Sequence, residues 1–102
     1  MKNFLLDFKK QEKFLRSDIS RFGKVDTFKR VWDDFGGLNE DNLPSLSYNN
    51  VELVHLGGNR MKVITWPMIV GSENTPPDKI EFVDVSNYPL VVELHRHLRR
   101  TY

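Results

Sequence analysis

The sequence predicts an α+β fold, in which a small antiparallel β-sheet of three to four strands packs against two N-terminal helices, with a further helix at the C-terminus. Three patterns lead to this expectation. Apolar residues recur at helical spacing before residue 37, alternate with polar residues through the middle of the chain, and return to helical spacing at its end. With 102 residues, of which 39% are hydrophobic, the chain has the length and composition of one domain spanning residues 1–102.

The N-terminal third predicts two helices, after a short segment at residues 3–8 that reads as a strand or as a first helical turn. The apolar face of the first helix consists of Phe8, Leu15, Ile19 and Phe22. Gly23 is expected to end this helix, because glycine accepts the left-handed conformation found at helix ends. Asp26 is expected to cap the second helix. The apolar face of the second helix consists of Phe28, Val31, Trp32 and Phe35.

The middle of the chain predicts a loop followed by a hairpin. Residues 38–50 are rich in Asn and Ser, which favour loops. Four residues are expected to anchor this loop to the core, namely Leu38, Leu43, Leu46 and Tyr48. Residues 51–56 and 61–66 then alternate between apolar and polar positions on either side of a Gly-Gly-Asn sequence. Glycine and asparagine tolerate the positive φ angles of tight turns, so this stretch predicts an antiparallel hairpin.

A third strand and a last helix complete the expected fold. Residues 71–78 predict a loop, and residues 79–85 alternate again as a strand. Ser86 or Asn87 is expected to cap the last helix, with Pro89 in its first turn. The apolar stripe of this helix consists of Leu90, Val91, Leu94 and Leu98.

The composition excludes several functional classes. The chain has no cysteine, which rules out a disulfide framework, a thiolate zinc site and a cysteine nucleophile. His95 and His97 project to nearly opposite sides of a helix, His95 at the boundary of the apolar stripe and His97 on the surface, so no metal site is expected. Phosphate-binding loops are missing, and no cofactor is expected. Every apolar run is shorter than about 20 residues, so we expect a cytoplasmic protein without membrane contact.

Basic residues are concentrated in the two ends of the chain. Residues 1–35 carry nine Lys and Arg against six Asp and Glu, and residues 95–102 carry three arginines and no acid. Residues 36–94 carry three basic residues against eight acidic ones. The overall charge of +1 hides this asymmetry, which permits a surface for nucleic acid or for an acidic partner.

Three groups of basic residues are candidates for binding nucleic acid or for RNA chemistry. They are a stripe on the first helix, a pair on the second hairpin strand and a stripe on the last helix, namely Lys9, Lys13, Arg16, Arg60, Lys62, Arg96, Arg99 and Arg100. Arg60 and Lys62 are two residues apart in a strand and so share a sheet face. Cations of this kind neutralise phosphates, and Trp66, Tyr88 or Tyr102 would stack on bases. The alternative for each stripe is the solvated back of an amphipathic helix.

Three stretches resemble the RelE/HigB superfamily of toxin–antitoxin ribonucleases. Residues 3–10 are similar to the family's first strand, which runs into a lysine-rich helix. Residues 54–64 resemble the HigB branch, in which a Gly-Asn turn leads into a strand with a basic residue followed by two aliphatic ones. The strand ending at Val85, followed by a tyrosine and a short basic helix, looks like the family's C-terminal element. The histidine that the HigB branch usually carries after this strand is missing here.

This resemblance implies a metal-independent mRNA endoribonuclease, in which a ribose 2′-hydroxyl attacks and an antitoxin covers the basic face. It implies that Lys62 stabilises the phosphate or the transition state, that Arg60 assists, and that Tyr88 stacks on or polarises the substrate. Arg96 would contact the RNA backbone, and mRNA or the ribosome would be a further partner. Such a site requires Lys62, Arg60, Tyr88 and Arg96 to lie in one groove.

A different class of function is a non-catalytic regulatory or inhibitor protein of phage or plasmid type, which binds a host protein or nucleic acid. The small size, the lack of a clear catalytic constellation and the long loops at residues 38–50 and 71–78 favour this alternative. A plain structural domain of a larger complex is a third interpretation. The surroundings of Lys62 discriminate between them, because burial of its neighbourhood by apolar residues would weaken the enzyme interpretation.

Overall fold

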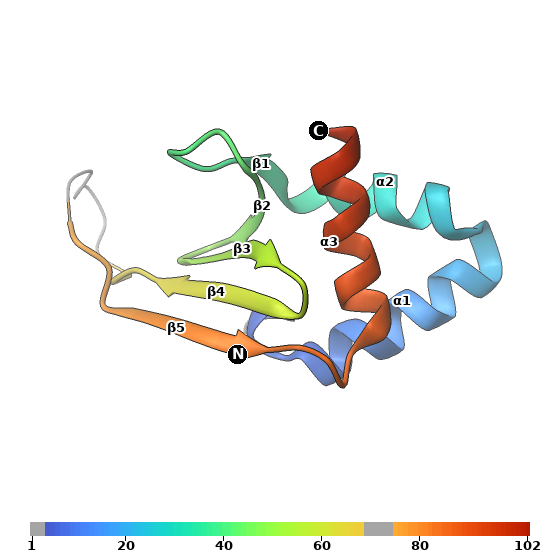
Figure 1. Ribbon diagram of the computed structural model, residues 1–102, viewed down its shortest axis with the longest axis horizontal. Coiled ribbons are helices and arrows are strands. Elements are labelled where there is room, and N and C mark those ends of the chain that lie inside the picture. The colour runs from blue at the N-terminus through green and yellow to red at the C-terminus, as the bar shows by residue number, and fades with distance from the viewer. Residues whose placement is uncertain (1–3, 69–74) are drawn as a thin grey trace.

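The computed structural model describes residues 4–68 and 75–102 and has an α+β fold (Figure 1). Its elements are η1 (Phe4–Leu6), α1 (Phe8–Phe22), α2 (Lys24–Phe35), β1 (Gly36–Leu38), β2 (Pro44–Tyr48), β3 (Val51–Gly57), β4 (Arg60–Thr65), β5 (Lys79–Asp84) and α3 (Pro89–Thr101). The strands pair antiparallel in the order β1-β2-β3-β4-β5. The predicted fold class is confirmed, with five strands in place of three to four. No helix in these two ranges is both long and apolar enough to cross a membrane.

β2 lies within residues 38–50, which the sequence predicted to be a loop, and β1 ends at the first residue of that range. β1 continues directly from α2, and β2 begins at Pro44, a position where a strand tolerates the missing N–H group. Between the two strands, Asn39 Oδ1 accepts hydrogen bonds from the backbone N–H groups of Asp41 and Leu43, both at 2.9 Å. This side chain shapes a turn that closes a hairpin, so the asparagine-rich composition marks the turn and not the whole segment.

Only part of the predicted loop anchoring is found. Leu46 faces the helices and is buried in the core, and Leu43 is half-buried. Leu38 and Tyr48 are exposed, so the anchoring role predicted for them is wrong. Tyr48 instead packs its ring edge-on against Phe35, with ring centroids 5.7 Å apart.

α1 and α2 meet at Gly23, which serves both helices. Its N–H donates to Ile19 O and its C=O accepts from Thr27 N, at a φ of 85° that glycine adopts readily. α2 therefore begins at Lys24 with Gly23 as its N-cap, and the predicted cap at Asp26 is wrong. Asp26 lies in the first turn instead, where the helix dipole favours a negative charge.

The N-terminus of α3 is capped by a side chain of α1. The predicted caps at residues 86–87 precede the helix, whose N-cap residue Tyr88 makes no side-chain capping bond. The buried carboxylate of Glu12 accepts hydrogen bonds from Leu90 N at 2.8 and 3.1 Å and from Val91 N at 3.1 Å. Helix N-termini favour a negative charge at these N–H groups. Glu12 thereby fixes the start of α3 on α1.

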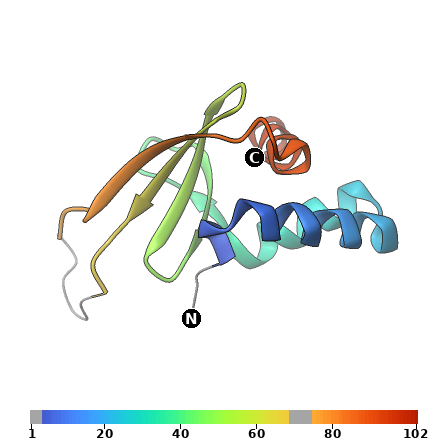
Figure 2. The same ribbon diagram turned by 90° about the horizontal axis from the view of Figure 1, so that it is seen from below.

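The sheet has one face toward the helices and one face away from them (Figure 2). Side chains alternate along each strand, so the inward face carries core residues such as Leu53, Met61 and Val63. The outward side chains of β3, β4 and β5 include Glu52, Val54, Arg60, Lys62, Ile64, Ile80, Phe82 and Asp84. The helices of the described chain leave this outer face uncovered.

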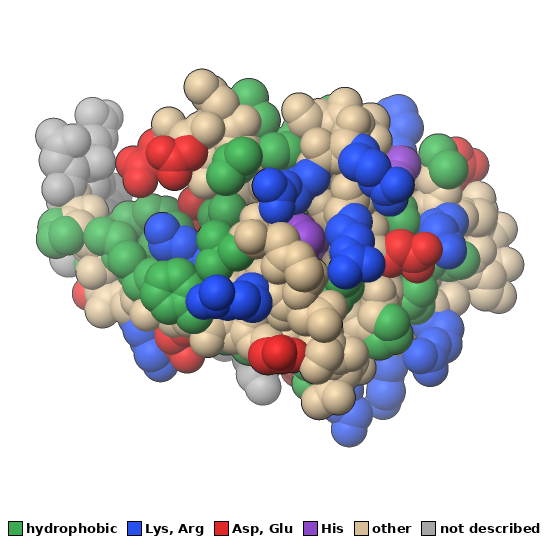
Figure 3. All heavy atoms as spheres, in the orientation of Figure 1, with side chains coloured by type: hydrophobic (Ala, Val, Ile, Leu, Met, Phe, Trp, Pro, Cys, Tyr) green, Lys and Arg blue, Asp and Glu red, His purple; other side chains and the backbone are tan. Residues whose placement is uncertain are grey.

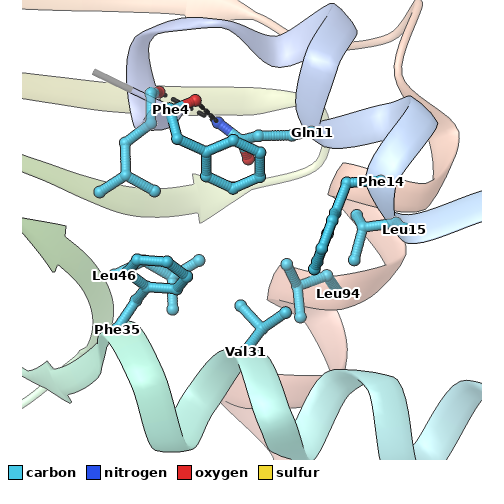
Figure 4. A pocket seen from close by; sticks show the side chains of 9 residues that line it. Phe4, Gln11, Phe14, Leu15, Val31, Phe35, Leu46 and Leu94 are labelled. Carbon is cyan, nitrogen blue, oxygen red and sulfur yellow. Dashed lines mark hydrogen bonds between the residues drawn. The ribbon is translucent and has the colours of Figure 1, made fainter. Parts of the chain in front are cut away.

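A small cavity lies in the core where η1 meets the helices (Figure 4). Gln11 and apolar side chains line it, and its volume is about 10 Å³. The amide of Gln11 donates to Leu5 O at 3.0 Å, which ties η1 to α1. A space of this size holds one water molecule at most. It is a packing feature of the core and not a ligand site.

Candidate nucleic-acid interface

The fold brings the two basic ends of the chain together. α1, from the N-terminal end, packs against α3, from the C-terminal end. Figure 3 shows Lys and Arg side chains over both helices in one view. The six residues predicted to bind nucleic acid are all exposed, and we call them the basic face, which consists of Lys9, Lys13, Arg16, Arg96, Arg99 and Arg100. The sheet and its loops come from the middle of the chain, which carries a net negative charge. The fold therefore places the net negative part of the chain apart from the basic residues of α1 and α3.

Among the described residues, the arginines of α3 form no ion pair with an acidic side chain. The ion pairs found within residues 4–68 and 75–102 are made by lysines, and none includes an arginine. Arg99 and Arg100 lie in the last turn of α3, where the helix dipole favours cations. The Arg99 side chain reaches the β3–β4 turn, since a Cβ atom built at Gly57 would lie 3.6 Å from Arg99 Nη1. These guanidinium groups are therefore available to bind phosphates.

An aromatic stack lies at the same end of α3. Tyr102 follows the helix and stacks on Trp32 of α2, with ring centroids 4.2 Å apart and 13° between the ring planes. Tyr102 remains 46% exposed, so one side of the stack is open to solvent. Exposed aromatic rings beside guanidinium groups are a common means of binding single-stranded RNA.

The residues predicted to cleave RNA do not share one groove. Arg60 and Lys62 lie on the outer face of the sheet together, as predicted. Tyr88 lies on the helical side, where its ring stacks on Phe8 at 5.8 Å and packs against the core. The condition for a ribonuclease site, that Lys62 meets Tyr88 and Arg96, is not fulfilled. The reason is the alternation along β4, which turns Lys62 away from the helices.

Two buried histidines lie close to the arginines of α3. His55 of β3 and His95 of α3 are 3% and 1% exposed, and their ring centroids are 6.0 Å apart. His55 Nε2 donates to Gly58 O at 2.9 Å, which assigns the proton to Nε2 and leaves Nδ1 as an acceptor. Within the described chain, His55 Nδ1 and His95 Nε2 have no hydrogen-bond partner. The boundary position predicted for His95 is wrong, because the residue lies inside the helix–sheet interface.

Burial lowers the pKa of both imidazoles, since a charged ring would lose its hydration there. Burial, with a contribution from His55, lowers the pKa of His95 to about 3. The pKa of His55 is lowered mainly by burial and further by Arg99 and Arg96, against the opposing hydrogen bond to Gly58. General acid–base catalysis needs a pKa near the working pH. At neutral pH the pair is therefore suited to packing and not to proton transfer.

Sequence reasoning missed the roles of Glu12 and His95, although a signal was present. Glu12 follows Phe8 by four residues and His95 follows Val91 by four, so each polar side chain interrupts an apolar stripe. A polar residue at such a position predicts a specific buried partner. The pattern does not name that partner, because it comes from a distant part of the chain.

No known protein family matches the sequence, and neither do any curated proteins or solved structures.

Proposed function

We propose that the protein is a non-catalytic regulatory protein that binds single-stranded RNA through the basic face of α1 and α3. The observation that carries this proposal is that six cations from the two ends of the chain are exposed on two packed helices. Within residues 4–68 and 75–102, the arginines of α3 make no ion pair. Cations in this arrangement attract a phosphate backbone and release its counterions. The open side of the Trp32–Tyr102 stack adds a surface on which a base can stack.

The arrangement of side chains favours binding over cleavage. Lys62 and Tyr88 lie on opposite sides of the sheet, and the buried histidines stay neutral at pH 7. The RelE/HigB-like endoribonuclease, with its antitoxin partner, is therefore a second interpretation that rests on the sequence resemblance alone. The two interpretations make different predictions for the RNA, which stays intact if the protein only binds it and is cut if the protein is a ribonuclease. The samples of the binding experiment can be checked for this cleavage.

Binding of a fluorescein-labelled single-stranded RNA, followed by fluorescence anisotropy at several salt concentrations, tests this proposal. Replacing Arg96, Arg99 and Arg100 by glutamine is expected to weaken binding by about 10- to 100-fold and to reduce the slope of log K against log salt by about 2. Both effects follow from the loss of three phosphate contacts.

A matched control removes three positive charges outside the basic face, at Arg21, Arg30 and Lys79. This variant has the same net charge, and it should keep the salt slope of the unmodified protein. Equal losses in both variants would mean that only net charge matters, and absence of RNA binding would overturn the proposal. Cleavage of the RNA that disappears in Lys62→Ala would establish the ribonuclease instead.

A further inference from the structure

The outer face of the sheet carries exposed apolar side chains beside charged ones, and no helix of the described residues covers it. Ile80 and Phe82 of β5 are 48% and 62% exposed, while Val54 and Ile64 beside them are buried within the face. Figure 3 shows hydrophobic side chains lying together over β4 and β5. Contiguous exposed apolar surface of this kind marks sites of interaction with other molecules.

A groove of about 430 Å³ lies on this face, between the β1–β2 turn and strands β3, β4 and β5. Its apolar lining includes Ile64, Trp66 and Ile80. Its charged lining consists of Glu40, Asp41, Glu52 and Lys62. Three carboxylates against one ammonium group make the groove negative, in contrast to the basic face of the helices. A phosphate backbone would be repelled here, whereas a cationic side chain would be attracted.

Glu52 is the carboxylate best placed to select a cation. It is half-buried on β3, and burial raises its pKa because the charged form loses hydration. Ser45 Oγ donates to Glu52 Oε2 at 3.4 Å, which favours the charged form. Within the described chain no Lys or Arg lies within ion-pair distance of Glu52. Lys62 of the same groove acts on Glu52 only from beyond ion-pair distance. A partly desolvated carboxylate that makes no direct ion pair gains more from a new one than a fully hydrated carboxylate.

From this groove we infer a second binding site, at which an extended segment of a partner protein places an arginine or lysine against Glu40, Asp41 and Glu52 and an apolar side chain against Ile80 and Phe82. The mixed lining selects this occupant, because the carboxylates require a cation and the exposed apolar side chains require an apolar neighbour. The site is independent of the RNA-binding proposal, since it lies on the outer face of the sheet. A protein with both sites would connect a partner protein to RNA.

Two fluorescein-labelled peptides test the inference, one with alternating arginine and valine residues and one in which glutamate replaces each arginine. Anisotropy titrations of the full chain are expected to show binding of the arginine peptide at least about 10-fold tighter than that of the glutamate peptide. Amide NMR shifts caused by the arginine peptide should map to β3 and β4 around Glu52 and Lys62. Equal affinity for the two peptides, or no binding of either, would overturn the inference.

Variants locate the site. Replacing Glu40, Asp41 and Glu52 by their amides should weaken the arginine peptide by at least about 10-fold, while amides at Asp26, Asp33 and Asp34 of α2 remove the same charge and should leave its affinity unchanged.

Lys62→Gln gives the sharpest outcome, because it removes the one cation from the groove and should tighten the arginine peptide by about 3-fold. Weaker peptide binding in Lys62→Gln would contradict a cation site. If the chain forms dimers that Phe82→Ala dissolves and the peptide does not compete with, a second copy covers this face and the partner-segment inference fails.

Discussion

Replacing Glu12 by alanine is expected to lower the free energy of unfolding by about 3 kcal/mol. The Glu12 side chain is almost fully buried and accepts three hydrogen bonds from N–H groups in the first turn of α3. Alanine leaves these groups without an acceptor and removes a negative charge from the positive end of the helix dipole. The contact joins residues that are 78 positions apart in the sequence. Its loss therefore weakens the attachment of the whole helix α3 to α1.

Urea denaturation followed by circular dichroism measures this effect. Glu12→Gln keeps an oxygen acceptor but loses the charge, and it should retain about half of the lost stability. Lys13→Ala changes the exposed neighbouring residue and should alter the free energy of unfolding by less than about 0.5 kcal/mol. If Glu12→Ala unfolds at the same urea concentration as Lys13→Ala, the carboxylate does not hold α3.

Lowering the pH from 7 to 4 is expected to remove about 3 kcal/mol of stability through His95 alone. The pKa of this histidine is about 3 in the folded protein, against an ordinary value of 6.5, because burial disfavours the charged ring. Between these two values the unfolded chain binds a proton that the folded protein does not. The contribution of His95 to the free energy of unfolding is therefore fully present above pH 6.5, and it decreases as the pH falls toward 3.

The comparison of His95→Leu with the unmodified protein isolates this contribution from that of the carboxylates. The variant should lose about 3 kcal/mol less between pH 7 and pH 4 than the unmodified protein does. NMR titration gives a second readout that does not need the variant to fold. A His95 ring that becomes protonated near pH 6 in the folded protein would contradict the assignment.

The elements that depend on local patterns can be predicted from the amino-acid sequence. The spacing of apolar residues predicts the helix α1, and Gly23 predicts where it ends, because helix periodicity and helix termination act within a few positions. The Gly-Gly-Asn turn predicts the β3–β4 hairpin, and alternation places Arg60 and Lys62 on one face. The exposure of the six residues of the basic face also follows from the sequence, since charged stripes opposite apolar ones are visible there.

Which of these elements pack against one another depends on the folded arrangement of the whole chain. β1 has three residues and is held by pairing with β2, so its own composition carries little strand signal. The packing of α1 on α3 brought together the two helices that carry the distant basic stripes, and the side of β4 on which Lys62 lies separated it from Tyr88. The hydrophobic effect is non-directional. An apolar stripe in the sequence therefore predicts that one face of a helix is buried, but not which element packs against that face. Contacts such as that of Glu12 with α3 therefore appear only when the chain has folded.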